Sequence, residues 1–249
     1  MNTSLLGLIG YPLGHSFSKA YFSQKFEKEG IREFSYELFP IANINLLPEV
    51  IARHPNLRGL NVTIPYKESV IQYLDFLDPR AKRIGAVNVI KIDQDGKLHG
   101  YNSDYSGFAA TLLQTKPAFE WKGIKALVFG TGGSSKAVTS CLEDFGIDFR
   151  IVSRNASDDQ LTYKELNAET MAEFSLLVHC TPVGMFPKTE DCVPIPYHSL
   201  SAMHIAIDLV YNPEETMFMR KVKEHGGTAV NGLTMLYAQA EKAWEIWNS

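Results

Sequence analysis

Residues 127–146 read LVFGTGGSSKAVTSCLEDFG, an apolar run followed by a glycine-rich turn and a helical pattern. Gly130 and Gly132 occupy the first two positions of the pattern G-x-G-x-x-G, and Ser135, which is also small, replaces the third glycine. A strand, a tight turn and a helix in this order predict a loop that binds a dinucleotide at the helix N-terminus; the alternative is a plain glycine-rich turn. The residues expected at this loop are Gly130, Thr131, Gly132, Gly133, Ser134 and Ser135.

The next expected strand, residues 148–153, ends at Ser153 and is followed by Arg154. A Rossmann domain selective for NAD places an acidic residue at about this distance, where it binds the ribose 2′-hydroxyl. Arginine at this point instead indicates a 2′-phosphate, and therefore NADP. Two alternatives stay open: Asp158 and Asp159 would repel that phosphate if they turned inward, and Arg154 could be a solvated loop charge.

Short apolar runs alternate with amphipathic helical patterns along most of the chain. This alternation is typical of βαβ units and of a mainly parallel sheet. The expected strands are residues 4–10, 34–39, 57–64, 124–130, 148–153, 174–180 and 204–210. The expected helices are residues 18–29 and 43–54, a helix from about Tyr105 and a last helix from about Gly232.

Two segments depart from this alternation, because VNVIKI (87–92) and KLHGYN (97–102) flank the turn signal Asp95-Gly96. They predict an antiparallel hairpin, so the first sheet is expected to be mixed. The last helix carries an apolar stripe with the spacing of a helix packed on one face. The stripe consists of Leu236, Ala240, Ala243 and Trp247.

Composition narrows the possible partners. The chain has 249 residues, enough for one large or two ordinary domains, and a formal net charge of -4 with no basic excess to hold nucleic acid. No window approaches the roughly 18 apolar residues of a membrane span, and the N-terminus has no basic region typical of an export signal. The three cysteines lack C-x-x-C spacing and are expected to be reduced and buried in a cytoplasmic chain with no metal site.

A lysine stands in an unusual place in GLNVTIPYKES (59–69), after a β-run and a proline. A helix is expected to begin here, and the unpaired N–H groups and dipole of a helix start favour negative charge. Lys67 would therefore not be there for stability. The alternative is a solvated surface lysine.

Eight stretches now line up in order along the chain: GYPLGHSFSK, GLNVTIPYK, IGAVNVI, GYNSDYSGF, FGTGGSSKAV, CTPVGM, DLVYNP and NGLTMLYAQA. Together they resemble the shikimate dehydrogenase family over essentially the whole length. The resemblance implies an α/β fold with two domains. Residues 1–104 and 233–249 would form a mixed-sheet substrate and catalytic domain, to which the C-terminal helix returns, and residues 105–232 a Rossmann-like NADP-binding domain.

The resemblance assigns Lys67 and Asp104 as the catalytic pair. Reducing a ketone requires a proton for the developing alkoxide, which a positioned ammonium can stabilise and supply. A helix start lowers the pKa of a lysine whereas a nearby carboxylate raises it, and their balance is left open. Taken alone, Asp104 could equally be a helix N-cap.

Further site residues are implied by the resemblance, although each could singly be structural, as a cap, a strand residue, a turn residue or a buried aromatic. Those matching substrate-binding positions are Ser16, Ser18, Asn61, Thr63, Asn88, Tyr211 and Gln239. Those matching cofactor contacts beyond the glycine-rich loop are Ser153, Arg154, Thr181 and Gly232. Where the family commonly has Asn-Arg-Thr, this chain has Ser153, Arg154 and Asn155 without a second basic residue nearby, which leaves the cofactor preference open.

The activity implied is the reversible reduction of 3-dehydroshikimate to shikimate with NADPH, in the pathway to chorismate and the aromatic amino acids. One alternative is a quinate/shikimate dehydrogenase that uses NAD. Another is a non-catalytic nucleotide-binding regulator of the same fold. No nucleic acid or membrane partner is expected, and the sequence does not indicate the oligomeric state.

Overall fold

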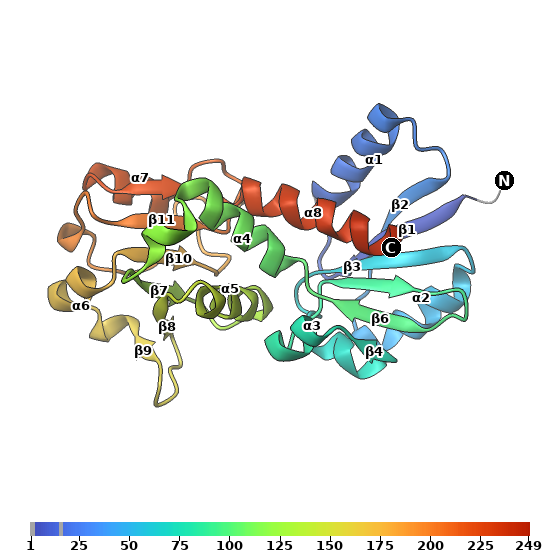
Figure 1. Cartoon of the computed structure of the whole chain (residues 1–249), viewed down its shortest axis with the longest axis horizontal. Helices are drawn as coiled ribbons and strands as arrows, with labels where there is room; N and C mark the ends of the chain where they lie inside the picture. Colours follow the sequence, from blue (N-terminus) through green and yellow to red (C-terminus); the bar gives the residue numbers. More distant parts are fainter. Residues whose placement is uncertain (1–2, 15–16) are drawn as a thin grey trace. The chain divides into compact units, whose positions relative to one another are not determined.

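The computed structural model describes residues 3–14 and 17–249. The chain divides into two compact units: unit 1 comprises Met1–Ser103 and Ala240–Ser249, and unit 2 comprises Asp104–Gln239 (Figure 1). Each unit contains one six-stranded sheet. The predicted α/β fold class is confirmed, with a mixed sheet in unit 1 and a parallel sheet in unit 2.

Unit 1 contains most of the elements expected in the N-terminal part of the chain. Its strands are β1 (Ser4–Gly10), β2 (Phe34–Pro40), β3 (Leu57–Val62), β4 (Phe76–Leu77), β5 (Val89–Ile92) and β6 (Leu98–Tyr101). Its helices are α1 (Phe17–Glu29), α2 (Leu47–Arg53) and α3 (Pro79–Ile84), with 3-10 helices at Ile44–Leu46 and Ser69–Tyr73. The strand order is β2-β1-β3-β5-β6-β4. β1 pairs in parallel with β2 and β3, whereas β5 runs antiparallel to β3 and to β6, so the predicted hairpin is confirmed.

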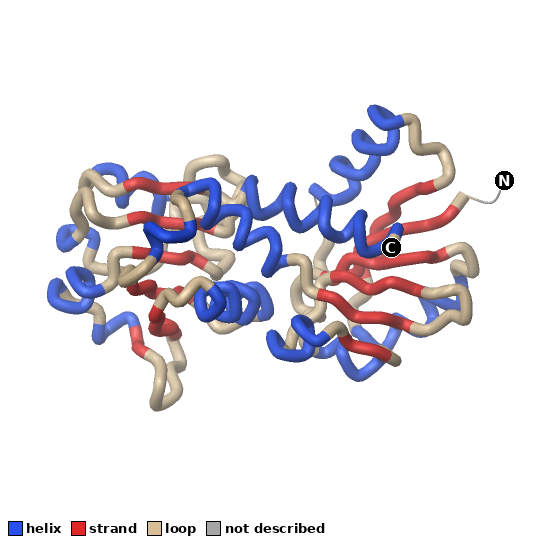
Figure 2. Tube along the Cα trace, viewed as in Figure 1, coloured by secondary structure: helices blue, strands red, loops and turns tan. Residues whose placement is uncertain are grey.

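The sheet of unit 1 is covered on both faces (Figure 2). One core cluster joins the sheet to α1 and to the end of α8 (Leu233–Asn248), and the other joins it to α2, α3 and the 3-10 helices. Trp247 of α8 occupies the space beside Gly59 that a Cβ would fill, and its indole N–H donates to the carbonyl of Ile90 at 2.9 Å. The four residues of the predicted apolar stripe are all buried, so the face predicted for this helix is confirmed.

Unit 2 is built around a parallel sheet. Its strands are β7 (Lys125–Phe129), β8 (Asp148–Ser153), β9 (Leu161–Thr162), β10 (Leu176–His179), β11 (Ile205–Asp208) and β12 (Thr228–Val230). Its helices are α4 (Asp104–Thr115), α5 (Gly133–Asp144), α6 (Ala168–Glu173) and α7 (Met217–Glu224), with 3-10 helices at Ala118–Trp121, Tyr163–Glu165 and Tyr197–Ser199. The strand order is β12-β11-β10-β7-β8-β9, so the chain leaves β7 first toward one edge and later returns to build the other. Ligands bind at such a switch point, outside the carboxyl ends of the strands.

Alternation along β7 shows how both faces of the parallel sheet are used. Ala126 and Val128 pack in the core cluster that includes α4 and α5, whereas Leu127 and Phe129 pack in the cluster that includes α6 and α7. Successive side chains of a strand point to opposite faces, so a continuous apolar run indicates a strand that is buried on both sides.

Some boundaries differ from the expected ones for local reasons. The helix expected at 43–54 is a 3-10 helix followed by α2, with Pro48 in the first turn of α2, where its missing N–H leaves no bond unmade. The strand expected at 57–64 ends at Val62. Of the three cysteines, only Cys141 is buried; Cys180 and Cys192 are partly exposed, and all three are free thiols. In the described part of the chain, no helix combines the length and hydropathy needed to cross a membrane.

Candidate functional site

The turn that carries Lys67 differs from the expected helix start. After β3 ends, the Tyr66 N–H donates to the carbonyl of Thr63, and Lys67 lies in the turn before the 3-10 helix Ser69–Tyr73. Leu74 already has extended backbone, so the segment is too short for an α-helix. No α-helix begins at Lys67, so the helix start expected there was wrong, and no α-helix dipole acts on this lysine. The Lys67 carbonyl accepts from Val87 N–H at 2.7 Å, which places this half-buried lysine beside the segment that carries Asn88.

A buried tyrosine joins two of the expected substrate-binding residues in unit 1. The Tyr36 hydroxyl donates to Oδ1 of Asn61 at 2.7 Å, and its oxygen is also hydrogen-bonded to the Ser18 side chain. Tyr36 is 3% exposed. Burial raises the pKa of its phenol, and the hydrogen bond with Ser18 opposes part of that rise. A phenol has one proton, so Ser18 is the donor toward Tyr36.

Asn88 continues this polar network. Its side-chain amide donates to the Ser103 hydroxyl at 3.0 Å and accepts from Ser103 N–H at 2.7 Å. Its backbone carbonyl accepts from Val62 N–H at 2.9 Å and from the Asn61 amide at 3.4 Å. We call Ser18, Tyr36, Asn61, Asn88 and Ser103 the polar cluster of unit 1. The cluster fixes the Asn61 amide with its oxygen toward Tyr36 and its NH₂ as the donor.

One further expected substrate-binding residue of unit 1 lies at the same edge of the sheet. Thr63 directly follows β3, is half-buried, and its N–H donates to the carbonyl of Ile9 near the end of β1 at 3.0 Å. Ser16 lies outside the described residues. Tyr36 was not predicted, because a tyrosine in the stretch FSYELF reads as an ordinary strand residue.

In unit 2 the glycine-rich loop has the geometry expected of a phosphate-binding turn. Gly130 follows β7 with φ +113°, a conformation that side chains strongly disfavour. Gly132 caps α5, and Thr131 and Gly132 are exposed. Ser135 is buried and its hydroxyl donates to the Gly130 carbonyl at 2.7 Å, so the residue at the third glycine position ties the helix to the turn. The first turn of α5 can therefore bind an anion with its backbone N–H groups.

The end of β8 places a cation close to this loop. Arg154 is exposed and acts electrostatically on Tyr163, whose ring stacks on Phe129 at 6.1 Å. Asp158 and Asp159 are also exposed, and among the described residues none forms an ion pair with Arg154.

The other expected residues of unit 2 lie on several elements. Asp104 is 1% exposed in the first turn of α4, and its charge acts on Cys180, next to β10. The Thr181 methyl packs against Gly130, and Gly232 lies against the backbone of Leu209 too closely for any Cβ. Tyr211, whose pKa is raised by burial, and Gln239 on α8 are both half-buried.

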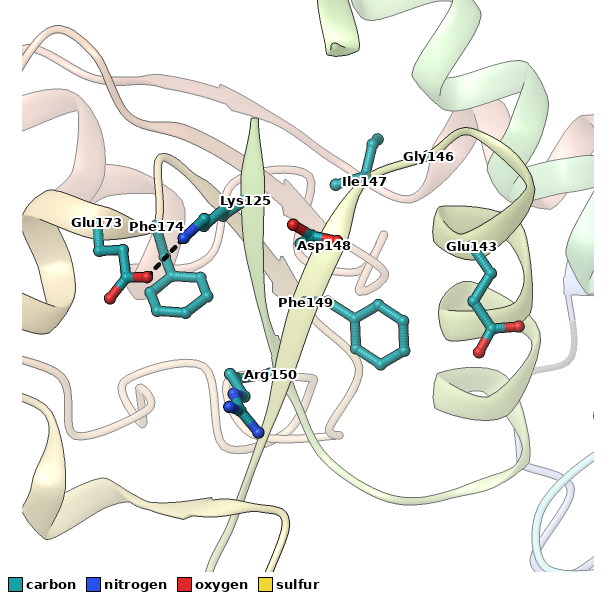
Figure 3. A pocket seen from close by; sticks show the side chains of 9 residues that line it. All are labelled: Lys125, Glu143, Gly146, Ile147, Asp148, Phe149, Arg150, Glu173 and Phe174. Atoms are coloured by element: carbon teal, nitrogen blue, oxygen red, sulfur yellow. Dashed lines mark hydrogen bonds and ion pairs between the residues drawn. The ribbon is translucent and has the colours of Figure 1, made fainter. Parts of the chain in front are cut away.

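A hollow of 580 Å³ lies elsewhere in unit 2, among residues at the start of β7 and β8 (Figure 3). Lys125 and Glu173 form an ion pair of 2.7 Å there, and Phe149 and Arg150 line its wall. None of the expected site residues contributes to it. Since the glycine-rich loop follows the opposite, carboxyl end of β7, this hollow is not the candidate site.

Comparisons with known proteins identify the family of the chain. The family model for the shikimate dehydrogenase substrate binding domain matches residues 8–90. The chain is 39% identical to a shikimate dehydrogenase (NADP(+)) of Clostridium perfringens, over 98% of this chain and 92% of that protein.

Similar solved structures cover nearly the whole chain. The shikimate dehydrogenase of Aquifex aeolicus has a TM-score of 0.88 and 33% identity, covering 99% of this chain and 92% of that one. The shikimate 5-dehydrogenase of Thermus thermophilus, solved in complex with NADP(H) and shikimate, has a TM-score of 0.82 and 31% identity, covering 98% and 93%. The chain belongs to the shikimate dehydrogenase family.

Proposed function

We propose that this chain is an NADP-dependent shikimate dehydrogenase, which reversibly reduces 3-dehydroshikimate to shikimate with NADPH. The observation that carries the proposal is family membership over nearly the full length, together with a glycine-rich loop shaped for a dinucleotide. The reaction places the chain in the shikimate pathway, which leads to chorismate and the aromatic amino acids. We propose a cytoplasmic location for it.

Substrate binding and dinucleotide binding are proposed for different parts of the chain, each built on one of the two sheets. We propose that residues 1–104 and 233–249 bind the substrate and that residues 105–232 bind the dinucleotide. The match of residues 8–90 to a substrate binding domain supports the first assignment, and the parallel sheet with its switch point at β7 supports the second.

Lys67 and Asp104 are the proposed catalytic pair. Bound NADPH supplies the hydride that reduces the carbonyl carbon. The Lys67 ammonium stabilises the negative charge that develops on the carbonyl oxygen and delivers a proton to it, and in the reverse direction the amine takes that proton back. We propose Asp104 as the carboxylate member of this pair.

The polar cluster of unit 1 suits a substrate that carries several hydroxyl groups. Its members are tied to one another, so their polar atoms are held in place before the substrate arrives. Asn61 offers an amide donor, and Ser18 offers oxygen lone pairs, since its proton goes to Tyr36. The proposed substrate-binding residues are Ser16, Ser18, Asn61, Thr63, Asn88, Tyr211 and Gln239.

Proposed cofactor contacts come from the glycine-rich loop and the strand ends around it. The α5 N-terminus would hold the pyrophosphate, and Arg154 would pair with the 2′-phosphate. The full proposed set is Gly130, Thr131, Gly132, Gly133, Ser134, Ser135, Ser153, Arg154, Thr181 and Gly232.

One assay of the purified protein separates the candidate functions. Initial rates are measured by NADPH or NADH absorbance for shikimate and for quinate, each with NADP and with NAD. We expect the highest kcat/KM for shikimate with NADP. A highest value for quinate or for NAD would favour a quinate/shikimate dehydrogenase, and NADP binding without turnover on any pair would favour a regulator.

A further inference from the structure

Two ionisable side chains are completely buried at the ends of neighbouring strands in unit 2. His179, the last residue of β10, and Asp208, the last residue of β11, are register partners and both are 0% exposed. His179 Nδ1 lies 2.9 Å from Asp208 Oδ1. Burying such groups costs free energy unless they are well paired, and the proposed function has given neither a role. They lie at the carboxyl edge of the parallel sheet, where this class of fold binds its ligands.

Asp208 determines which nitrogen of the His179 ring carries the proton. Its Oδ1 also accepts from Val210 N–H at 2.9 Å, and its Oδ2 accepts from the Thr216 hydroxyl at 2.6 Å. A carboxylate surrounded by donors has no proton to give, so the ring Nδ1–H donates to it. In the neutral ring, Nε2 then carries no proton and is an acceptor.

The acceptor nitrogen faces Thr181. The Thr181 hydroxyl lies 2.6 Å from His179 Nε2, and its oxygen also accepts from Val183 N–H at 3.3 Å. On its other side, the Thr181 methyl carbon would lie 2.9 Å from a Cβ placed on Gly130, the first glycine of the phosphate-binding turn. The side chain is therefore held in one orientation, with its only proton committed to the ring.

We infer that His179 is a positioning residue of the dinucleotide site, which holds the Thr181 hydroxyl so that its oxygen can accept a hydrogen bond from the cofactor but cannot donate one. One oxygen lone pair remains after the contact with Val183. The cofactor group at Thr181 must then carry an N–H or O–H, as a ribose hydroxyl or the carboxamide does. A phosphate oxygen, which carries no proton, would be repelled there. The inference rests on the proposed binding of NADP.

The ring proton can be observed directly in the unaltered protein. Nitrogen-15 chemical shifts of the His179 ring, assigned by comparison with His179→Gln, report which nitrogen is protonated at neutral pH. We expect a proton on Nδ1 and none on Nε2. A proton on Nε2 in the free protein would overturn the inference, because Thr181 could then donate to the cofactor.

A double-mutant cycle tests whether the two side chains act on the cofactor as one unit. The dissociation constant for NADPH is measured by fluorescence for His179→Leu, Thr181→Val and the double variant. Because one hydrogen bond is worth about 0.5 to 1.5 kcal/mol, each single change should weaken NADPH binding about two- to tenfold. The NADPH dissociation constant of the double variant should be no higher than the higher of the two single-variant values. KM for shikimate should stay unchanged in the two single variants and in the double variant. Thr181→Ser, which keeps the hydroxyl, should bind NADPH within about twofold of the wild type.

The outcomes are distinguishable. A folded His179→Leu variant with an unchanged NADPH dissociation constant would mean that the ring only supports the fold, and additive losses would mean that the two residues act separately; either overturns the inference. If His179→Leu does not fold, the ring protonation and the contrast between Thr181→Val and Thr181→Ser decide. A wild-type protein that does not bind NADPH would reject the proposed function instead.

Discussion

Removing the Tyr36 hydroxyl should weaken substrate binding although Tyr36 is buried and outside the set of proposed substrate contacts. In Tyr36→Phe, Asn61 Oδ1 loses the donor at 2.7 Å and Ser18 loses its acceptor. Two lost hydrogen bonds should lower the free energy of unfolding by about 1 to 3 kcal/mol. KM for shikimate should also rise, because Asn61 and Ser18 both lose the contact with Tyr36 that fixes their polar atoms.

The size of the effect on KM follows from the number of orientations released. Without Tyr36, the Asn61 amide can adopt two orientations, so the fraction in the orientation that binds substrate falls by up to about twofold. The Ser18 hydroxyl can adopt three staggered positions, so its binding-competent fraction falls by up to about threefold. We therefore expect KM for shikimate to rise about two- to sixfold. The change in kcat should be smaller, because Tyr36 is not proposed to act on the reacting atoms.

The control removes a hydrogen-bonded tyrosine hydroxyl from unit 2 instead of unit 1. Steady-state kinetics with shikimate and NADP are compared for wild type, Tyr36→Phe and Tyr197→Phe. The Tyr197 hydroxyl donates to the Val193 carbonyl at 2.9 Å in unit 2, so its loss should leave KM for shikimate unchanged. A folded Tyr36→Phe protein with wild-type KM, or an equal rise in Tyr197→Phe, would refute the idea that Tyr36 orients the polar cluster.

Three further predictions concern catalysis, cofactor choice and pH. Lys67→Ala should lower kcat by about 10²- to 10⁴-fold, as expected for loss of a general acid, while the NADPH dissociation constant stays unchanged; the exposed Lys82→Ala is the control, and near-normal turnover in Lys67→Ala would exclude the catalytic role. Arg154→Ala should reduce the preference for NADP over NAD by about tenfold or more, mainly through KM for NADP, since a charge-assisted hydrogen bond is worth about 1.5 to 3 kcal/mol; an undiminished preference would show that Arg154 faces solvent. The backbone N–H of Leu98, and after it the Lys97 ammonium, lower the pKa of Asp75 below its ordinary value of 3.8. A lowered folded-state pKa gives stability that is present above 3.8 and lost as the pH falls through the lowered value, so Asp75→Asn should lose less stability than wild type on acidification in urea melts. Equal acid sensitivity of the two proteins would contradict that assignment.

Local patterns were enough to predict most elements of the fold. The strand β7, the tight glycine turn after it and the helix that follows depend on neighbouring residues, and they were predicted correctly. The hairpin β5–β6 and the buried stripe of α8 were likewise predicted from local sequence, the hairpin from its turn signal and the stripe from the spacing of apolar residues. The shortest strands were not predicted, because two or three residues are too few to show an alternating pattern.

Partners across the sheets could not be predicted from these patterns. Tyr36 lies 25 residues from Asn61, and His179 lies 29 residues from Asp208. Tyr36 and Asn61 meet because β2 and β3 both pair with β1, which lies between them in the sheet. His179 and Asp208 meet because β10 and β11 are neighbours and pair in register. Taken singly, a tyrosine in a strand and a histidine beside a cysteine gave no sign of a role.

By itself, the sequence determined the α/β class, the glycine-rich turn between β7 and α5, the apolar face of the last helix and, through its ordered motifs, the family. Only the tertiary structure decided the order of the strands, the orientation of the Asn61 amide and the pairing of His179 with Asp208. It also replaced the helix expected at Lys67 with a turn held by Val87. The physical reason is that secondary structure follows from the periodicity of neighbouring residues, whereas hydrogen-bond partners depend on which distant segments the folded sheet brings into register.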